Sequence, residues 1–380
     1  GMNSVRPALD LASGAINPFM GMVAYGEYVC TLHDQQPDSP KARGCVNASL
    51  PEAFFERLDE MRGKGLPCNI LYLRLGWSWF EPEEGVYAWR DSASPLARYV
   101  EGARERRLQL AFRVLTGDHY DRENRGLTST RQTLPPWLFA KPGFTFYRNS
   151  EGSPCPHYDN PVYLAHYEGL VRELARDFGD PGFVAFVDAQ GLGMWGEMHE
   201  LRTRRPFGVN RAVLNHAAIW TRHFHQVLLG ACFGGSVDRI NRRRVVPRYR
   251  HMVRRDGYGS RWITPAFEKA YLQGMLPNRV PSYGEMCYWH LNDYQALKQH
   301  FDREPDLAFT GDKERDLSRY FALVMDQAAR FRVNTLDVRV PGDWAAWLAY
   351  GQAQLARFEQ EGGYRLAPEE ITWPKKARAG

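Results

Sequence analysis

Eight short apolar segments recur along this 380-residue chain, and amphipathic segments separate them. Short runs rich in branched and aromatic residues favour buried strands, whereas the longer segments between them have helical periodicity. The predicted strands span 19–25, 69–77, 108–116, 183–190, 227–234, 251–257, 280–286 and 335–340. The predicted helices span 51–63, 93–106, 161–178, 210–226, 265–274, 314–331 and 343–360. The remaining connection, VDRINRRRVVPR at 237–248, has no clear helical pattern, and we expect it to be short.

Strands that alternate with helices predict parallel βα units, and eight such units predict a (β/α)8 TIM barrel. The alternative is an open doubly wound sheet. That fold needs a glycine-rich phosphate turn after its first strand, and MVAYGEYV at 22–29 lacks one. We expect a single barrel domain over residues 1–362. Residues 363–380 are expected to form a C-terminal extension that either caps the barrel or begins a β-sandwich.

Side-chain alternation predicts which residues face the barrel interior. In the second strand, Leu71, Leu73 and Leu75 share one face, and Tyr72 and Arg74 share the other. The apolar face should meet the surrounding helices, which sends the polar face inward. By the same argument the inward polar residues of the second to fourth strands are Arg74, Arg113, Asp188 and Gln190. Buried arginines need partners, and carboxylates near the barrel mouth are the expected ones. A purely structural layer of ion pairs is the alternative interpretation for Arg113 and Asp188.

The composition excludes several classes of function. The 49 basic and 44 acidic residues give a net charge of only +5, spread evenly, which does not favour a nucleic-acid partner. No apolar run is long enough for a membrane span. The histidines at 216, 223 and 225 lack zinc-site spacing, and no nucleotide-binding signature is present, so we expect neither a metal nor a cofactor. The aromatic content of 13% fits a large core or a sugar-binding cleft.

The six cysteines are scattered and form no CxxC motif. A disulfide between Cys30 and Cys45 would fit an exported protein, and six free, mostly buried thiols are the alternative. Gly1 before Met2 looks like the remnant of a cleaved tag, so the lack of a visible signal peptide leaves the compartment open. We favour the periplasm or secretion over the cytoplasm. The oligomeric state stays open.

Active sites of TIM barrels lie at the C-terminal ends of the strands, so residues there are the functional candidates. Glu197 and Glu285 each follow a glycine at the tip of a strand, the fourth and the seventh, on opposite sides of the mouth. Two carboxylates flanked by aromatic rings are what glycoside hydrolysis needs, one to protonate the leaving oxygen and one to attack the anomeric carbon. The candidate substrate-binding residues are Arg74, Trp77, Asp118, His119, Trp195, His199, Asp256, Tyr283 and Trp289.

The segment RLGWSWFEPEEGVYAW at 74–89 resembles the strand-2 signature W-S-x-x-E-P-x-x-G-x-Y/F of barrel glycosidases such as the family 42 and family 35 β-galactosidases. GMWGEMH, RRDGYGS and SYGEMCYW together look like a bacterial glycosidase-like barrel family related to them. This resemblance covers residues 17–375 and implies that Glu197 is the acid/base and Glu285 the nucleophile of a retaining enzyme. Two positions depart from the pattern: Gly196 replaces an asparagine, and Tyr283 replaces a glycine.

The resemblance also places Arg74 beside the nucleophile. A nearby cation favours the ionised carboxylate, so Arg74 should lower the pKa of Glu285 while Glu197 stays protonated. A retaining glycoside hydrolase acting on an oligo- or polysaccharide is therefore one hypothesis. A carbohydrate-binding barrel that keeps the cleft but lacks catalysis is the other. For Glu197 itself, a plain surface charge is the alternative to a catalytic acid. Neither the sugar nor the linkage can be named from the sequence.

Overall fold

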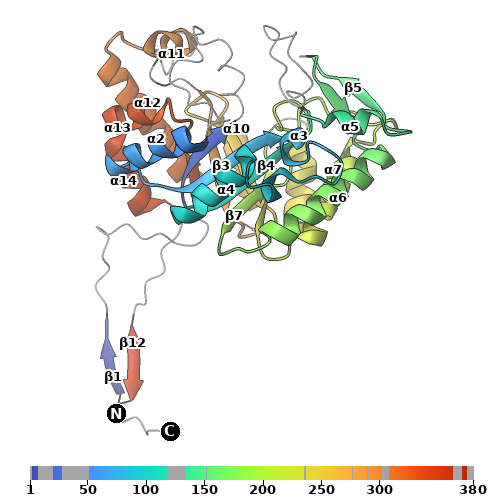
Figure 1. The fold of residues 1–380 in the computed structure, drawn as a ribbon. Helices are drawn as coiled ribbons and strands as arrows, with labels where there is room; N and C mark the ends of the chain where they lie inside the picture. The colour runs from blue at the N-terminus through green and yellow to red at the C-terminus, as the bar shows by residue number, and fades with distance from the viewer. Residues whose placement is uncertain are drawn as a thin grey trace.

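The computed structural model describes residues 2–6, 20–27, 51–117, 133–150, 152–234, 237–275, 277–288, 291, 293–301, 308–362 and 370–374. Eight of its strands close into a parallel barrel in the order β2-β3-β4-β7-β8-β9-β10-β11, with helices packed around them (Figure 1). The barrel strands are β2 (Gly21–Glu27), β3 (Cys68–Gly76), β4 (Gln109–Leu115), β7 (Val184–Asp188), β8 (Leu228–Cys232), β9 (Met252–Tyr258), β10 (Ser282–Met286) and β11 (Thr335–Asp337). The predicted (β/α)8 TIM barrel and all eight of its strands are confirmed.

The seven predicted helices are also present. The helices that follow the barrel strands are α2 (Pro51–Gly63), α4 (Pro95–Glu105), α6 (Pro161–Phe178), α7 (Val209–His223), α10 (Pro265–Met275), α11 (Tyr294–Phe301), α12 (Lys313–Arg330), α13 (Trp344–Tyr350) and α14 (Gln352–Glu361). The helix predicted over 343–360 is broken at Gly351, and α11 was not predicted. The irregular fifth connection consists of α8 (Asp238–Ile240), a π-helical turn (Asn241–Val245) and α9 (Val246–Tyr249).

Local sequence signals explain where the long helices begin. Asn160 caps α6 by accepting a hydrogen bond from the backbone of Tyr163, and Pro161 takes the first helical position. Asp312 caps α12 in the same way through the backbone of Arg315. These caps satisfy backbone donors that no helical carbonyl can reach.

Smaller elements surround the barrel mouth and the chain ends. They are α3 (Trp77–Phe80), a 3-10 turn (Ala88–Arg90), α5 (Pro136–Phe139) and the antiparallel pair β5 (Phe146–Arg148) and β6 (Pro154–Pro156). In addition, β1 (Met2–Val5) pairs antiparallel with β12 (Ile371–Pro374) in a sheet of its own, away from the barrel in Figure 1. Whether residues 363–380 belong to a further domain stays a prediction. Among the described helices, none has both the length and the apolar character to cross a membrane.

The barrel interior consists of an apolar floor with a polar layer above it. The floor residues are Val23, Tyr25, Ile70, Tyr72, Ala111, Ala185, Phe186, Met252, Tyr283 and Val340. Two residues further along the strands, the same inward faces carry Arg74, Arg113, Asp188, Arg254 and Glu285. The leucines at 71, 73 and 75 pack outward against the helices. The alternation predicted for the second to fourth strands is therefore confirmed.

Gly191 follows β7 and leaves no room for a side chain. A Cβ atom there would lie 2.1 Å from the carbonyl oxygen of Val114 and 2.9 Å from Cγ of Arg113. We predict that Gly191→Ala lowers the free energy of unfolding by about 1–3 kcal/mol, measured by urea denaturation. The matched control is Gly63→Ala at the end of α2, where a Cβ would have no neighbour within 4 Å. An equal effect of both substitutions would contradict this packing argument.

Candidate active site

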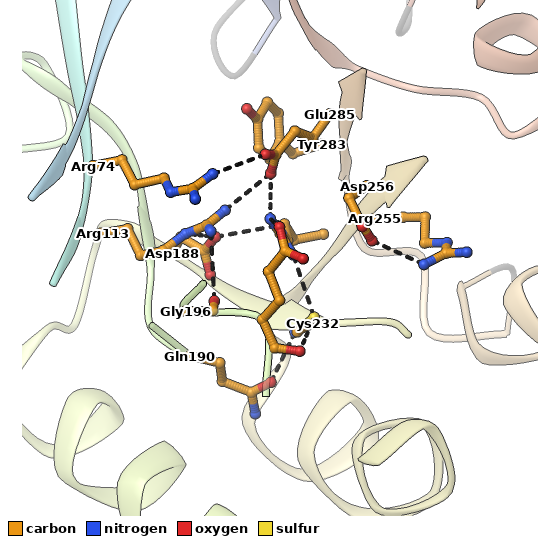
Figure 2. A network of polar contacts seen from close by, with 12 residues as sticks. Arg74, Arg113, Asp188, Gln190, Gly196, Cys232, Arg255, Asp256, Tyr283 and Glu285 are labelled. Atoms are coloured by element: carbon orange, nitrogen blue, oxygen red, sulfur yellow. Dashed lines mark hydrogen bonds and ion pairs between the residues drawn. The ribbon is translucent and has the colours of Figure 1, made fainter. Parts of the chain in front are cut away.

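Glu285 on β10 lies at the centre of the polar layer and is 2% exposed. Arg74 Nη1 on β3 is 3.2 Å from its Oε1 atom, and Arg113 Nη2 on β4 is 3.1 Å from its Oε2 atom (Figure 2). Arg254 on β9 donates to Oε2 as well, and Arg339, just beyond β11, lies 3.7 Å from Oε1. Four buried guanidinium groups thus converge on one carboxylate.

These arginines decide the ionisation of Glu285. Burial acts to raise the pKa of this carboxyl group, but the positive charges, with Arg254 first and Arg113 second, lower it well below its usual range. Arg74 contributes to the same shift. The predicted contact between Arg74 and Glu285 is therefore present, and Glu285 is a carboxylate at neutral pH.

Asp188 at the end of β7 completes the ion network. Its Oδ2 atom lies 2.7 Å from Arg113 Nε and 3.4 Å from Arg254 Nε, and it also accepts a hydrogen bond from the Tyr72 hydroxyl at 3.1 Å. Arg113 therefore bridges Asp188 and Glu285 across the interior. Gln190, two residues further on, hydrogen-bonds Asn241 and the backbone of Cys232, which joins the end of β7 to that of β8.

Glu197 lies in the loop after β7, and Arg254 connects it to Glu285. The Nη2 atom of Arg254 is 3.1 Å from Glu197 Oε1 and also contacts Glu285 Oε2. Two oxygens that each hydrogen-bond one nitrogen at about 3 Å cannot be more than about 6 Å apart. The structure thus brings together the two glutamates that the sequence analysis paired.

The loop that holds Glu197 has an unusual backbone. Trp195, Met198 and Glu200 all have φ values between 54° and 66°, a region that non-glycine residues rarely adopt. Hydrogen bonds fix this conformation, including Met198 N to the carbonyl of Leu192 and Glu197 N to that of Met194. Strained residues of this kind cluster at functional sites, where the surrounding contacts hold them in place.

Gly196 explains one departure from the glycosidase pattern. Its φ is +65°, and a Cβ atom would lie 2.3 Å from Cδ2 of Leu115 and 3.1 Å from Cδ of Arg113. An asparagine here would be strained at this positive φ and would have to displace the Leu115 side chain. The carbonyl of Gly196 instead accepts a hydrogen bond from Arg113 at 3.4 Å.

His199 and Asp256 stand at the edge of the carboxylate pair. His199 Nε2 is 3.8 Å from Glu197 Oε2, and the close Glu197 carboxylate raises the pKa of His199. Burial and the charge of Glu197 raise the pKa of Asp256, whose Oδ1 atom binds Arg255 Nη1 at 2.8 Å. Both residues were predicted as site residues, and both lie beside Glu197.

The ionisation of Glu197 differs from the prediction. Burial acts to raise the pKa of Glu197, but the contact with His199 and the charge of Arg254 outweigh it and lower the pKa to about 2. Arg74 lowers the pKa of both glutamates and does not separate them. In the free protein both glutamates are therefore ionised, because the buried guanidinium groups favour each carboxylate.

Two predicted substrate-binding residues lie inside the protein instead of in the cleft. Trp77 is fully buried among Trp137, Tyr163 and Tyr167, and its indole N–H donates to Glu81 Oε2 at 2.9 Å. The other oxygen of Glu81 accepts from the backbone of Gly85, so the strand-2 signature forms a structural turn here.

Tyr283 is the second of these residues. It lies in the apolar floor with no exposed surface, and its hydroxyl is 2.6 Å from that of Tyr25. Tyr283 thus lies beneath the polar layer, whereas Trp77 packs into the surrounding helix layer.

The remaining predicted residues fall into two groups. Trp195 is partly buried with its ring edge-on to His199, 5.7 Å between centroids. Asp118, His119, Trp289 and the Cys30–Cys45 pair lie outside the described residues. Cys68, Cys155, Cys232 and Cys287 are free thiols. Within the described part of the chain, no cluster of three metal-ligating side chains is present.

Sequence reasoning missed Arg254, Arg339 and Trp262. Arg254 follows the same alternation that revealed Arg74, because Met252 and Arg254 share the inward face of β9. Arg339 lies beyond β11 at a φ of 68°, so strand alternation gives no signal for it. Trp262, just after β9, is 56% exposed, and its carbonyl accepts a hydrogen bond from Arg255 Nη2 at 3.2 Å. Its ring is exposed to solvent, unlike the buried ring of Trp77.

No family model and no curated protein matches this chain. Solved structures of similar architecture include xylanase 10B from Thermotoga petrophila in complex with xylobiose, at 11% identity and a TM-score of 0.45, covering 88% of this chain and 86% of that one. A glycoside hydrolase family 5 enzyme from Prevotella bryantii, in complex with a xyloglucan tetradecasaccharide, matches at 12% identity and a TM-score of 0.49, covering 90% and 96%.

A family 5 mannosidase from Rhizomucor miehei matches at 10% identity and a TM-score of 0.49, covering 90% of this chain and 94% of that one. Likeness at such low identity concerns the barrel alone. The side chains at its mouth are therefore the basis for a functional assignment.

Removing Arg113 should destabilise the protein strongly, because Asp188 and Glu285 would each lose a buried partner. We predict that Arg113→Met lowers the free energy of unfolding by about 3–5 kcal/mol, measured by urea denaturation at pH 7. The control is Arg90→Met, which removes the partly exposed pairs with Glu173 and Asp177 and should cost less than about 1 kcal/mol. Similar losses in both variants would mean that the interior network adds no stability.

Proposed function

We propose that this protein is a retaining glycoside hydrolase that cleaves O-glycosidic bonds in an oligo- or polysaccharide. The observation that carries the proposal is the pairing of Glu197 and Glu285, from opposite sides of the barrel mouth, through one nitrogen of Arg254. A separation below about 6 Å fits the spacing of about 5–5.5 Å between the carboxyl groups of retaining enzymes better than the wider spacing of inverting ones. Trp195, whose ring lies edge-on to His199, would supply a ring for stacking on the sugar.

In this proposal Glu285 is the nucleophile. Its lowered pKa keeps it ionised, and the polar layer around it fixes its orientation. Attack on the anomeric carbon would form a glycosyl ester at Glu285, and water would then hydrolyse it. Glu197 would protonate the departing oxygen in the first step and activate the water in the second.

The proton for the first step needs a source, because Glu197 is ionised in the free protein. We infer that His199 holds this proton, since its pKa is raised and its Nε2 atom faces Glu197 at 3.8 Å. A bound sugar would exclude water from the pair, and a drier environment favours two neutral groups over an ion pair. Transfer from His199 to Glu197 would then leave a neutral imidazole beside a protonated acid.

Glu197→Gln tests the assignment of the acid/base. We predict that turnover of a glycoside with a poor leaving group falls by about 10²–10⁴-fold, as expected when general acid catalysis is lost. A dinitrophenyl glycoside, whose leaving group needs no proton, should react with Glu285 nearly as fast as before. The control is Glu60→Gln on α2, since the Glu60 carboxylate pairs with Arg57 and Lys64 on the exposed surface. Unchanged turnover of both substrates would remove Glu197 from the mechanism.

The pH profile tests the role of His199. The groups that face it are Glu197, Glu200, Asp256 and Arg254. Because the raised pKa of His199 keeps the proton available to higher pH, we predict that His199→Gln moves the basic limb of kcat/KM to lower pH. The control is His166→Gln on α6, beside Glu84 and Trp137. A basic limb that stays in place in the His199 variant would show that His199 does not supply the proton.

A carbohydrate-binding barrel without catalysis is the second candidate. The observation in its favour is that Arg254 occupies the space between the two carboxylates and pairs with both. A fluorinated glycoside that traps covalent intermediates distinguishes the candidates. Mass spectrometry should find the label on Glu285 if the protein is a retaining enzyme. Binding of the sugar, read from tryptophan fluorescence, with no label and no hydrolysis would support the binding barrel.

A further inference from the structure

Arg254 lies where a substrate would have to bind. In a retaining enzyme the anomeric carbon and the departing oxygen fit between the nucleophile and the acid/base. Here Nη2 of Arg254 contacts both carboxylates, so a glycoside that enters this space must take that nitrogen away from Glu197, Glu285 or both. Resting on the proposed function, this inference concerns which kind of sugar can replace Glu197 or Glu285 as the partner of that nitrogen.

When a substrate breaks a salt bridge of Arg254, the guanidinium group cannot move out into solvent. It is 1% exposed and is anchored on β9 within the barrel. Its other neighbours are Asp188, 3.4 Å from Nε and already bound to Arg113, and the thiol of Cys232, 3.4 Å from Nη1. A neutral sugar would leave this guanidinium beside the Asp188 carboxylate that Arg113 already binds. A buried charge with so little compensation is costly.

The charge balance of the site points in the same direction as this geometry. Among the side chains that the structure describes, the buried guanidinium groups of the site belong to Arg74, Arg113, Arg254 and Arg339, and the buried carboxyl groups that contact them belong to Asp188, Glu197, Glu285 and Asp337. Burial raises the pKa of Asp337 to about 7, so near neutral pH this carboxyl group is only partly ionised. The positive charges then exceed the negative ones.

Catalysis would widen this imbalance. When Glu285 forms a glycosyl ester its carboxylate loses its charge, while the four arginines around it keep theirs. A negative charge carried by the sugar would restore the balance at that stage. Arginine also binds carboxylates through two parallel hydrogen bonds, which suits Arg254 to this exchange.

We propose that the sugar bound between Glu197 and Glu285 is a uronic acid, and that Arg254 selects it by binding its carboxylate. The ring carboxylate of a hexuronic acid is attached two bonds from the ring oxygen, close to the anomeric centre. This carboxylate can therefore accept the hydrogen bonds that Arg254 donates to Glu197 and Glu285 before the sugar enters between them. Arg254 is thus a specificity-determining residue as well as a partner of the nucleophile.

Nitrophenyl glycosides of both anomers test the proposal: glucuronides and galacturonides against glucosides, galactosides and their 6-sulfates. We expect kcat/KM for the best uronide to exceed that of its neutral counterpart by about 10- to 100-fold or more, the range that a charge-assisted hydrogen bond supplies. Arg254→Met should remove most of this preference and Arg254→Lys should keep part of it. The control, Arg248→Met on α9, should leave the preference unchanged.

A binding measurement covers the case in which the Arg254 variants fail to fold. Calorimetry with the unmodified protein should show tighter binding of glucuronate or galacturonate than of glucose or galactose, and added salt should weaken only the former. Faster hydrolysis of neutral glycosides, or of the 6-sulfates, would overturn the uronic acid inference and leave the hydrolase proposal intact. Uronate binding without hydrolysis of any glycoside would overturn the hydrolase proposal and retain the uronate site.

Discussion

The contact of Arg254 with both Glu197 and Glu285 is the interaction on which the rest of the site depends. Guanidinium and carboxylate groups are buried together only when each has a partner, because the interior cannot solvate an isolated charge. Removing one member would therefore disturb the others through the shared oxygens of Asp188 and Glu285. The polar layer acts as one unit, and its geometry sets the spacing of the two glutamates.

The layers beneath and beside this network hold it in place. Tyr72 in the apolar floor donates to Asp188, and Tyr283 packs below Glu285. The loop of Glu197 holds three non-glycine residues at positive φ and is fixed by its own backbone hydrogen bonds. Such support would keep the two glutamates oriented before a ligand arrives, which is what the proposed hydrolase needs. In that proposal a substrate would exchange partners with Arg254 instead of pushing it aside.

The fold followed closely from the sequence, and the site followed in part. The apolar segments and the caps of α6 and α12 act over a few residues, so local reasoning found them. Alternation placed Arg74 and Arg113 inside the barrel for the same reason. The burial of Trp77 and the ionised state of Glu197 could not be predicted, because both depend on neighbours from distant strands and helices. A tryptophan at a strand end can point into the cleft or into the helix layer, and the packing of Trp137 and Tyr167 decides which.

By itself the sequence determined the eight βα units, the inward faces of the strands and the presence of two glutamates at the tips of the fourth and seventh. These are consequences of periodicity, which is a property of neighbouring residues. The tertiary structure alone decided that four arginines surround Glu285, that Gly196 adopts a positive φ beside Leu115, and that His199 faces Glu197. Ionisation and reactivity are set by charges and burial at a few ångströms, and only closure of the barrel brings residues from separate strands to that distance.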